Sequence, residues 1–218
     1  MEFILLRQFN LCDRMINQID VALGCLFVPE QRVSVRQNPA INQPDTVMSA
    51  EEKQAVIAFM RVNHTGEVCA QALYQAQSLT ARQNTTQTNM IQAAQDEIDH
   101  LAWCEERLRE LNGHTSYLNF FWYSGSFILG ALAGAAGDRW SLGFVAETER
   151  QVTAHLQGHA AKLPAKDHKT RLILTQMAQD EIRHANHAVS AGGKSLPWIC
   201  QQSMRWMARC MTTMSSYM

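Results

Sequence analysis

Two short segments of the chain carry the same pattern of acidic and histidine side chains. Residues 94–100 read AQDEIDH and residues 178–184 read AQDEIRH, so that six of seven positions agree. In each segment a glutamate precedes a histidine by three residues, which places both side chains on one face of a helix. A carboxylate and an imidazole on one face can bind the same metal ion. We therefore predict four metal ligands: Glu97, His100, Glu181 and His184.

A dinuclear metal site in a helix bundle needs one further glutamate from each of two other helices. Glu67 precedes Glu97 by 30 residues and Glu149 precedes Glu181 by 32, which indicates two copies of one helix pair. Glu147 is an alternative to Glu149, but its spacing fits less well and it would point to another helix face. Burial of four ionised glutamates requires compensating charge. Mixed oxygen and nitrogen ligation favours iron or manganese over structural zinc, and we expect two iron ions.

Each segment also has an aspartate directly before its glutamate, Asp96 in the first and Asp180 in the second. A metal-bound histidine usually donates its other ring N–H to a carboxylate or a carbonyl. We predict that Asp96 accepts this hydrogen bond from His184 and that Asp180 accepts it from His100, across the helix pair. Aspartates that are merely solvated are the alternative.

Five further positions lie close to the predicted ligands in the sequence. His64 shares a helix face with the first glutamate and fits either a place beside the site or a structural role. Gly66 costs a helix about 1 kcal/mol relative to alanine, which close approach of a helix or a substrate, or ordinary packing, would explain. His155, six residues after the fourth glutamate, is predicted to lie near the site. Asp99 and Arg183, which differ between the two segments, should face away from the metals.

Helical signals surround all of these residues, and no strand pattern is present. Ser49 and Glu52 form a capping-box pattern, and Asn112-Gly113 is a common helix stop. The fold class is therefore all-α, a four-helix bundle with an internal two-fold helix-pair duplication plus extra apolar helices. Residues 1–47 are predicted to form an N-terminal amphipathic helix and a linker, and residues 48–218 the metal-binding domain. The predicted helices cover about residues 49–80, 139–162 and 167–191, and the segment after Pro197. A further helix is predicted to begin within the polar run 81–89 and to end at residue 112.

Composition restricts the class of protein. The chain has 218 residues, 46% of them hydrophobic and 18% charged, and a net charge of −1, so a single ordered domain is expected and no nucleic-acid partner. Six cysteines without a CxxC pair, and without a secretory signal, indicate reduced thiols in a cytosolic setting.

The apolar segment 117–137 approaches the length of about 20 residues that a transmembrane helix needs. A buried core helix and a helix that dips into one leaflet are the other interpretations. We favour attachment to one leaflet, because the ligand-bearing helices on both sides must return to one bundle. The C-terminal segment, rich in methionine and tryptophan, fits the same apolar surface or plain core packing.

Four segments resemble a known family, the 3-demethoxyubiquinol 3-hydroxylases of ubiquinone biosynthesis. They are RVNHTGEVCAQALYQAQ (61–77), QDEIDH (95–100), AETERQVTAHL (146–156) and QDEIRH (179–184), and the resemblance extends from about residue 11 to the C-terminus. The family typically has NHAGE and then Val-Gly-Ala at the first glutamate, where this chain has Thr65 and Cys69. An aromatic residue often follows the histidine at position 155, where this chain has Leu156. The metal ligands of the family correspond to Glu67, Glu97, His100, Glu149, Glu181 and His184.

The resemblance implies a ferritin-like di-iron monooxygenase on the cytoplasmic face of a bacterial membrane, or at the inner mitochondrial membrane of a eukaryote. Its substrate would be a polyprenylated benzoquinol, with O2 and a reduced nicotinamide or another electron donor as co-substrates. A biosynthetic complex or a homo-oligomer is a further expectation. Three other functions are compatible with such a site. A rubrerythrin-like peroxidase would need a rubredoxin-type cysteine module, and a tRNA hydroxylase would need a basic surface. An iron-storage subunit would need a soluble exterior that can form a cage. A lipid-binding scaffold is compatible with catalysis.

Overall fold

The computed structural model describes residues 11–30 and 32–218. These residues form seven α-helices and no strand, which confirms the all-α prediction. The first ten residues of the predicted N-terminal amphipathic helix lie outside the described part of the chain. The helices are α1 (Leu11–Leu26), α2 (Ala50–Thr80), α3 (Asn84–Glu110), α4 (Asn119–Ala135), α5 (Asp138–Lys162), α6 (His168–Ser190) and α7 (Trp198–Tyr217).

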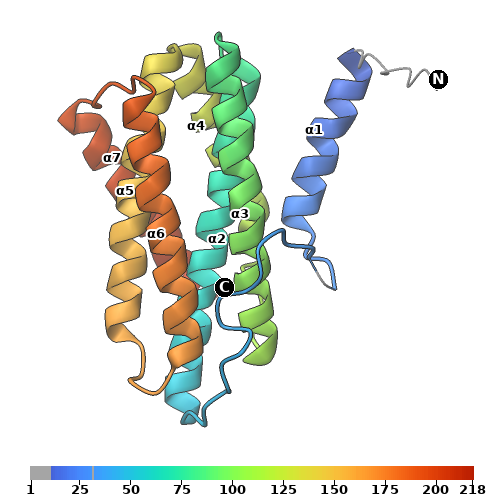
Figure 1. Cartoon of the computed structure of the whole chain (residues 1–218), viewed down its shortest axis with the longest axis vertical. Coiled ribbons are helices and arrows are strands. Elements are labelled where there is room, and N and C mark those ends of the chain that lie inside the picture. Colours follow the sequence, from blue (N-terminus) through green and yellow to red (C-terminus); the bar gives the residue numbers. More distant parts are fainter. Residues whose placement is uncertain (1–10, 31) are drawn as a thin grey trace.

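Four long helices, α2, α3, α5 and α6, run side by side and form a bundle (Figure 1). α2 packs along α3 and α5 packs along α6, so the bundle consists of two helix pairs. The pairs meet through contacts of α3 with α6 and of α2 with α5. The two AQDEIxH segments lie on α3 and α6, and the two additional glutamates lie on α2 and α5. This is the duplicated helix pair that the sequence predicts.

The helices begin and end at residues whose types favour such ends. The Ser49 hydroxyl accepts a hydrogen bond from the Glu52 amide at 3.2 Å, and the Glu52 carboxylate accepts one from the Ser49 amide at 2.7 Å. This pair is the capping box predicted at the start of α2. Asp167 caps α6 in a similar way, because its carboxylate accepts from the Thr170 amide at 3.1 Å. Beyond α3, Asn112 has a φ of 52°, a left-handed conformation that asparagine tolerates.

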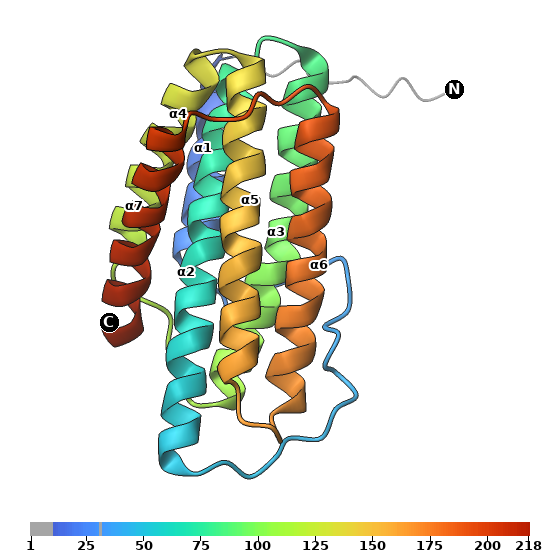
Figure 2. The same cartoon turned by 90° about the vertical axis from the view of Figure 1, so that its left-hand side faces the viewer.

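The two additional helices, α4 and α7, lie against the same side of the bundle (Figure 2). α4 packs mainly on α2, and α7 contacts both α2 and α5. α4 corresponds to the apolar segment 117–137, which is now seen to be one helix of 17 residues. Among the described helices, none combines the length and the apolar character needed to cross a membrane.

Small residues let α4 approach α2 closely. A Cβ atom on Gly130 would lie 2.7 Å from the backbone oxygen of Leu73, and one on Gly134 would lie 1.8 Å from the Thr80 hydroxyl. Both distances are shorter than any ordinary contact. The glycines of this apolar segment therefore serve helix packing, at least on the face that α4 turns toward α2.

Residues 32–38, here called the strap, cross α3 before the chain reaches α2. Arg32 donates to both oxygens of Glu105 at 2.7–3.1 Å. The backbone amides of Val35 and Arg36 donate to Asp99 at 2.7 and 3.3 Å. Asp99 thus points away from the predicted metals, as expected, but it is buried and anchors the strap. The strap is part of the packed structure, whereas the domain boundary at residues 47–48 stays a prediction.

Gly130→Ala should lower the free energy of unfolding by about 1–3 kcal/mol, because the added methyl group overpacks the contact between α4 and α2. Gly125→Ala is the matched control on the same helix, since a Cβ at Gly125 would meet nothing within 4 Å. The control should be neutral or stabilise the chain by up to about 1 kcal/mol through helix propensity. Urea denaturation measures both values, and equal effects of the two substitutions would contradict the close approach.

Candidate metal centre

The six predicted ligands come from the four helices of the bundle, and all six are buried. Glu67 lies on α2 and Glu149 on α5, whereas α3 and α6 each supply a glutamate and a histidine. Helical spacing turns the two members of each pair in one direction. Because the pairs face each other across the bundle, side chains 84 residues apart in the sequence meet at its centre.

The Nδ1 atom of His100 faces three carboxylates. It lies 2.8 Å from Glu97, 3.1 Å from Glu181 and 3.5 Å from Glu67. Donor atoms of these four residues lie within 4.8 Å of one another, close enough to hold one ion. A single N–H group on Nδ1 cannot satisfy three acceptors, so a cation suits this point better than a proton does.

The Nδ1 atom of His184 faces two of the same carboxylates. It lies 3.2 Å from Glu181 and 3.4 Å from Glu97. Glu97 and Glu181 therefore each contact both histidines of the predicted ligand set. Oε1 of each is buried and lies 3.1–3.4 Å from a histidine Nδ1, but accepts no well-aligned hydrogen bond. Two carboxylates that each contact both imidazoles fit a pair of divalent ions, although metal binding by the six residues stays a prediction.

Glu149 lies beside this cluster and is held by Tyr74, whose hydroxyl donates a short hydrogen bond to its carboxylate. Glu147 points elsewhere, because its carboxylate accepts from Gln151 at 2.7 Å and lies 4.0 Å from Arg150. The geometry thus favours Glu149 over Glu147, as the spacing does. Sequence reasoning missed Tyr74, although its position two helical turns after Glu67 places it on the ligand-bearing face of α2.

Burial and mutual repulsion govern the charges at the centre. Burial, then the charge of Glu97, raises the pKa of Glu67 well above its usual range. Burial, then the charge of Glu181, does the same to the pKa of Glu149. Burial alone would lower the pKa of His184, but its contacts with Glu181 and Glu97 raise it to about 12. Without metal, protons must therefore supply the positive charge that this cluster requires.

Both predicted aspartate contacts are present. Nε2 of His100 lies 3.0 Å from Asp180, and Nε2 of His184 lies 3.0 Å from Asp96. These contacts leave both Nδ1 atoms directed at the glutamates. Arg36 of the strap also donates to Asp180, at 2.7 Å. Burial opposes ionisation of Asp180, but the hydrogen bonds from His100 and Arg36 hold its pKa below its usual range.

The two histidines predicted near the site have different surroundings. His64 is buried and its Nε2 lies 3.3 Å from Glu105, which Arg32 of the strap also binds. This arrangement favours the structural interpretation of His64. His155 lines a cavity that also reaches Glu67, and its Nε2 is buried without a hydrogen-bond partner. Burial, then the charge of Lys162, lowers the pKa of His155 to about 4, so it is neutral at pH 7.

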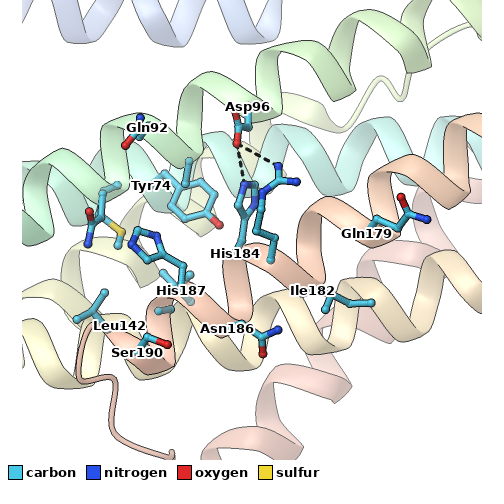
Figure 3. Close-up of a pocket in the computed structure, with 16 residues that line it drawn as sticks. Tyr74, Gln92, Asp96, Leu142, Gln179, Ile182, His184, Asn186, His187 and Ser190 are labelled. Atoms are coloured by element: carbon cyan, nitrogen blue, oxygen red, sulfur yellow. Dashed lines mark hydrogen bonds and ion pairs between the residues drawn. The ribbon is translucent and has the colours of Figure 1, made fainter. Parts of the chain in front are cut away.

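Two cavities approach the cluster from opposite sides of the bundle. The first, of about 400 Å3, lies among α2, α4, α5 and α7, is mostly apolar and reaches Glu67. The second, of about 710 Å3, opens between α3 and α6 and has a mixed lining that is more polar than that of the first (Figure 3). Among its lining residues Tyr74 and His184 are buried, whereas Asp96 is partly exposed. The candidate centre therefore has one apolar and one polar approach.

Comparison with known proteins identifies the family. A family model described as ubiquinone biosynthesis protein COQ7 matches residues 54–215. The chain belongs to this family. A 3-demethoxyubiquinol 3-hydroxylase of Legionella pneumophila strain Corby is 55% identical over 212 residues, which cover 97% of this chain and 100% of the relative. A protein of the same name from Acinetobacter baumannii strain ACICU is 50% identical over 213 residues, 98% of this chain and 100% of the relative.

Membership of the COQ7 family confirms the resemblance seen in the sequence, and the all-helical architecture agrees with the ferritin-like bundle that it implied. The match includes all six predicted ligands, the additional polar residues Tyr74, Asp96 and Asp180, the whole of α4 and most of α7. The strap, residues 32–38, lies before the matched range but within the nearly full-length similarity to the relatives.

Glu149→Ala should reduce the iron content of the purified protein from about two ions per chain to about one, because one of the four predicted carboxylate ligands is lost. Glu147→Ala is the matched control, two residues away on the same helix, and should keep about two. Iron analysis and Mössbauer spectroscopy measure both. A Glu149→Ala protein with two irons and full activity would move the fourth carboxylate to Glu147 or elsewhere.

Removal of iron should make the stability of the chain fall with rising pH. Glu67 and Glu149 have a pKa in the folded state above the ordinary value of 4.5. Their contribution to the free energy of unfolding is therefore complete below pH 4.5 and is lost as the pH rises through that folded-state pKa. The raised pKa of His184 acts in the same direction. The lowered pKa of Glu97 has the opposite sign, but its contribution is already complete above about pH 5.

Thermal unfolding of chelator-treated protein should therefore show a Tm that decreases by several degrees between about pH 5.5 and 8. The iron-loaded protein should lack this decrease, because metal ions replace the protons. Parallel pH profiles of the two forms would show that the buried glutamates are not the metal ligands.

Proposed function

We propose that the chain is a di-iron monooxygenase that hydroxylates the ring of demethoxyubiquinol, a polyprenylated methoxy-benzoquinol, in ubiquinone biosynthesis. The observation that carries this proposal is the similarity over nearly the whole chain to relatives named 3-demethoxyubiquinol 3-hydroxylase, at 50–55% identity. The buried cluster of glutamates and histidines supports it, because such a donor set fits the two irons that activate O2 in bundle enzymes.

The apolar cavity suits a quinol substrate. Its mostly apolar lining extends to Glu67. Two buried ring nitrogens on its wall, Nε1 of Trp122 and Nε2 of His155, have no hydrogen-bond partner. An unpaired buried polar group costs about 1–3 kcal/mol, and the oxygens of a quinol ring could satisfy both. Neutral His155 can donate or accept such a hydrogen bond. Because Leu156 replaces the usual aromatic residue, we assign no electron-transfer role to this position.

Gly66 lines the same cavity. A Cβ atom there would meet nothing within 4 Å, so no neighbouring helix requires glycine at this position. Helix packing, one of the two explanations given for Gly66, is therefore wrong. The absent side chain instead leaves space beside Glu67, which agrees with the approach of a flat ring to the metal centre.

The outer surface near the cavity is apolar. On α4, Phe120 and Phe121 are more than 60% exposed, and on α7 Trp198 and Trp206 are 69% and 68% exposed. Aromatic side chains of this kind favour the interface of a bilayer. We propose that α4 and α7 attach the enzyme peripherally to the cytoplasmic face of a bacterial membrane, from which an insoluble isoprenoid substrate could enter between these two helices.

The reaction requires O2, two electrons and two protons, and it yields the hydroxylated ring and one water molecule. A reduced nicotinamide or another two-electron donor supplies the electrons. Bound iron would supply the activation of O2. The side chains of this chain perform the remaining tasks: Asp96 and Asp180 orient the two ligand histidines, Tyr74 holds Glu149, and the apolar lining excludes water from the ring.

Expression of the chain in a bacterial mutant that lacks its own demethoxyubiquinol hydroxylase tests the proposal. The chain should restore ubiquinone, whereas a Glu97→Ala variant, which loses a carboxylate placed between both histidines, should leave demethoxyubiquinone to accumulate. Lipid extracts analysed by mass spectrometry distinguish the two quinones. Persistent demethoxyubiquinone with normal amounts of the unaltered protein would refute the substrate assignment.

A further inference from the structure

The two ends of the candidate centre differ in their access to solvent. At one end His100 and Asp180 have fully buried side chains, and Arg36 of the strap binds both Asp180 and Asp99. The guanidinium of Arg36 also lies over the ring of Trp103, 5.0 Å from its centroid. At the other end the side chain of Asp96 is 36% exposed and that of His184 is 8% exposed. The strap therefore closes one end, and the other end is open.

We propose that the polar cavity between α3 and α6 is the route by which hydrated ferrous iron reaches the centre. This inference rests on the proposed di-iron function and adds to it a site for metal uptake, distinct from the substrate cavity. The cavity leads from the surface to Asp96 and His184, which contact each other at 3.0 Å (Figure 3). An ion that follows it would therefore meet a carboxylate first and a predicted ligand next.

The lining offers ligands that can replace the water molecules of a ferrous ion in steps. Gln92 lies one helical turn before Asp96 on α3, and His187 lies one turn after His184 on α6. Both line the cavity, and Figure 3 shows them on the side of Tyr74. Amide oxygen, imidazole and carboxylate are donors that divalent iron accepts. Gln92 and His187 are exposed, whereas Asp96 is partly buried and His184 is buried, so the two pairs lead from the surface inward.

The other approaches are less suitable for a dication. Most of the apolar cavity would force the ion to shed water with few replacement ligands, which is strongly unfavourable. The end at Asp180 is covered by the strap. Arg183 is the unfavourable charge on the polar route, since it lies 3.6 Å from Asp96. It is 57% exposed and also bound to Asp180 at 2.8 Å, so two carboxylates and solvent offset its charge.

Iron uptake by metal-free protein tests the route. Ferrous ammonium sulfate is mixed anaerobically with chelator-treated full-length protein, uptake is stopped with excess chelator at set times, and protein-bound iron is measured. The double variant Gln92→Leu/His187→Leu should slow uptake at least about tenfold, because it removes the replacement ligands. It should still reach two irons per chain, with an unchanged Tm. Ala208→Leu, which narrows the apolar cavity, is the control and should leave the uptake rate unchanged.

A second pair of variants tests the opposite change. Gln92→Glu adds negative charge at the open end and should speed uptake severalfold, with the gain lost at high salt. Gln37→Glu adds the same charge on the strap, at the closed end, and should have no such effect. These variants keep the proposal testable if the double variant does not fold.

The outcomes separate this proposal from the one on function. Unchanged uptake by the double variant at full final iron content, slower uptake by Ala208→Leu, or faster uptake by Gln37→Glu than by Gln92→Glu would each overturn the route. Failure of the unaltered protein to bind iron would instead refute the di-iron function. None of these measurements depends on the identity of the organic substrate.

Discussion

The structure depends on one electrostatic constraint, the burial of four glutamates and two histidines at the centre of a helix bundle. Glu97 and Glu181 each contact both histidines, and burial raises the pKa of Glu67 and Glu149. Such a cluster is tolerable only with protons or metal ions among the carboxylates. The surrounding residues serve this requirement: two aspartates hold the outer nitrogens of the histidines, and Tyr74 holds the fourth glutamate.

Duplication of a helix pair does not make the two halves of the centre equivalent. Asp180 is buried beneath Arg36 of the strap, whereas its counterpart Asp96 is partly exposed beside a polar cavity. The apolar helices α4 and α7 cover a different side and form the other cavity with α2 and α5. A nearly symmetric ligand set is thus placed in an asymmetric environment. Under the two proposals above, an insoluble substrate and a hydrated ion would approach the same centre from different sides.

Much of this architecture could be predicted from the sequence, because the signals are local. The capping box at Ser49 and the break near Gly137 lie where helices begin, and a spacing of three residues places Glu97 with His100. The expected partnership of Asp96 with His184 follows from chemistry and from the internal repeat. The interpretations that failed or were incomplete concern contacts between elements: Gly66 packs against no helix, and Asp99 anchors the strap.

The sequence by itself therefore determined the helices, the faces of their polar residues and the set of candidate metal ligands, since periodicity and ligand chemistry depend on neighbours within a few turns. Tertiary structure alone decided that Arg36 covers Asp180, 144 residues away in the chain, that Tyr74 binds Glu149, and that Glu147 turns aside. It also decided which end of the centre opens to water. These features depend on how distant segments pack, because exposure and cavities belong to the assembled bundle and to no single helix.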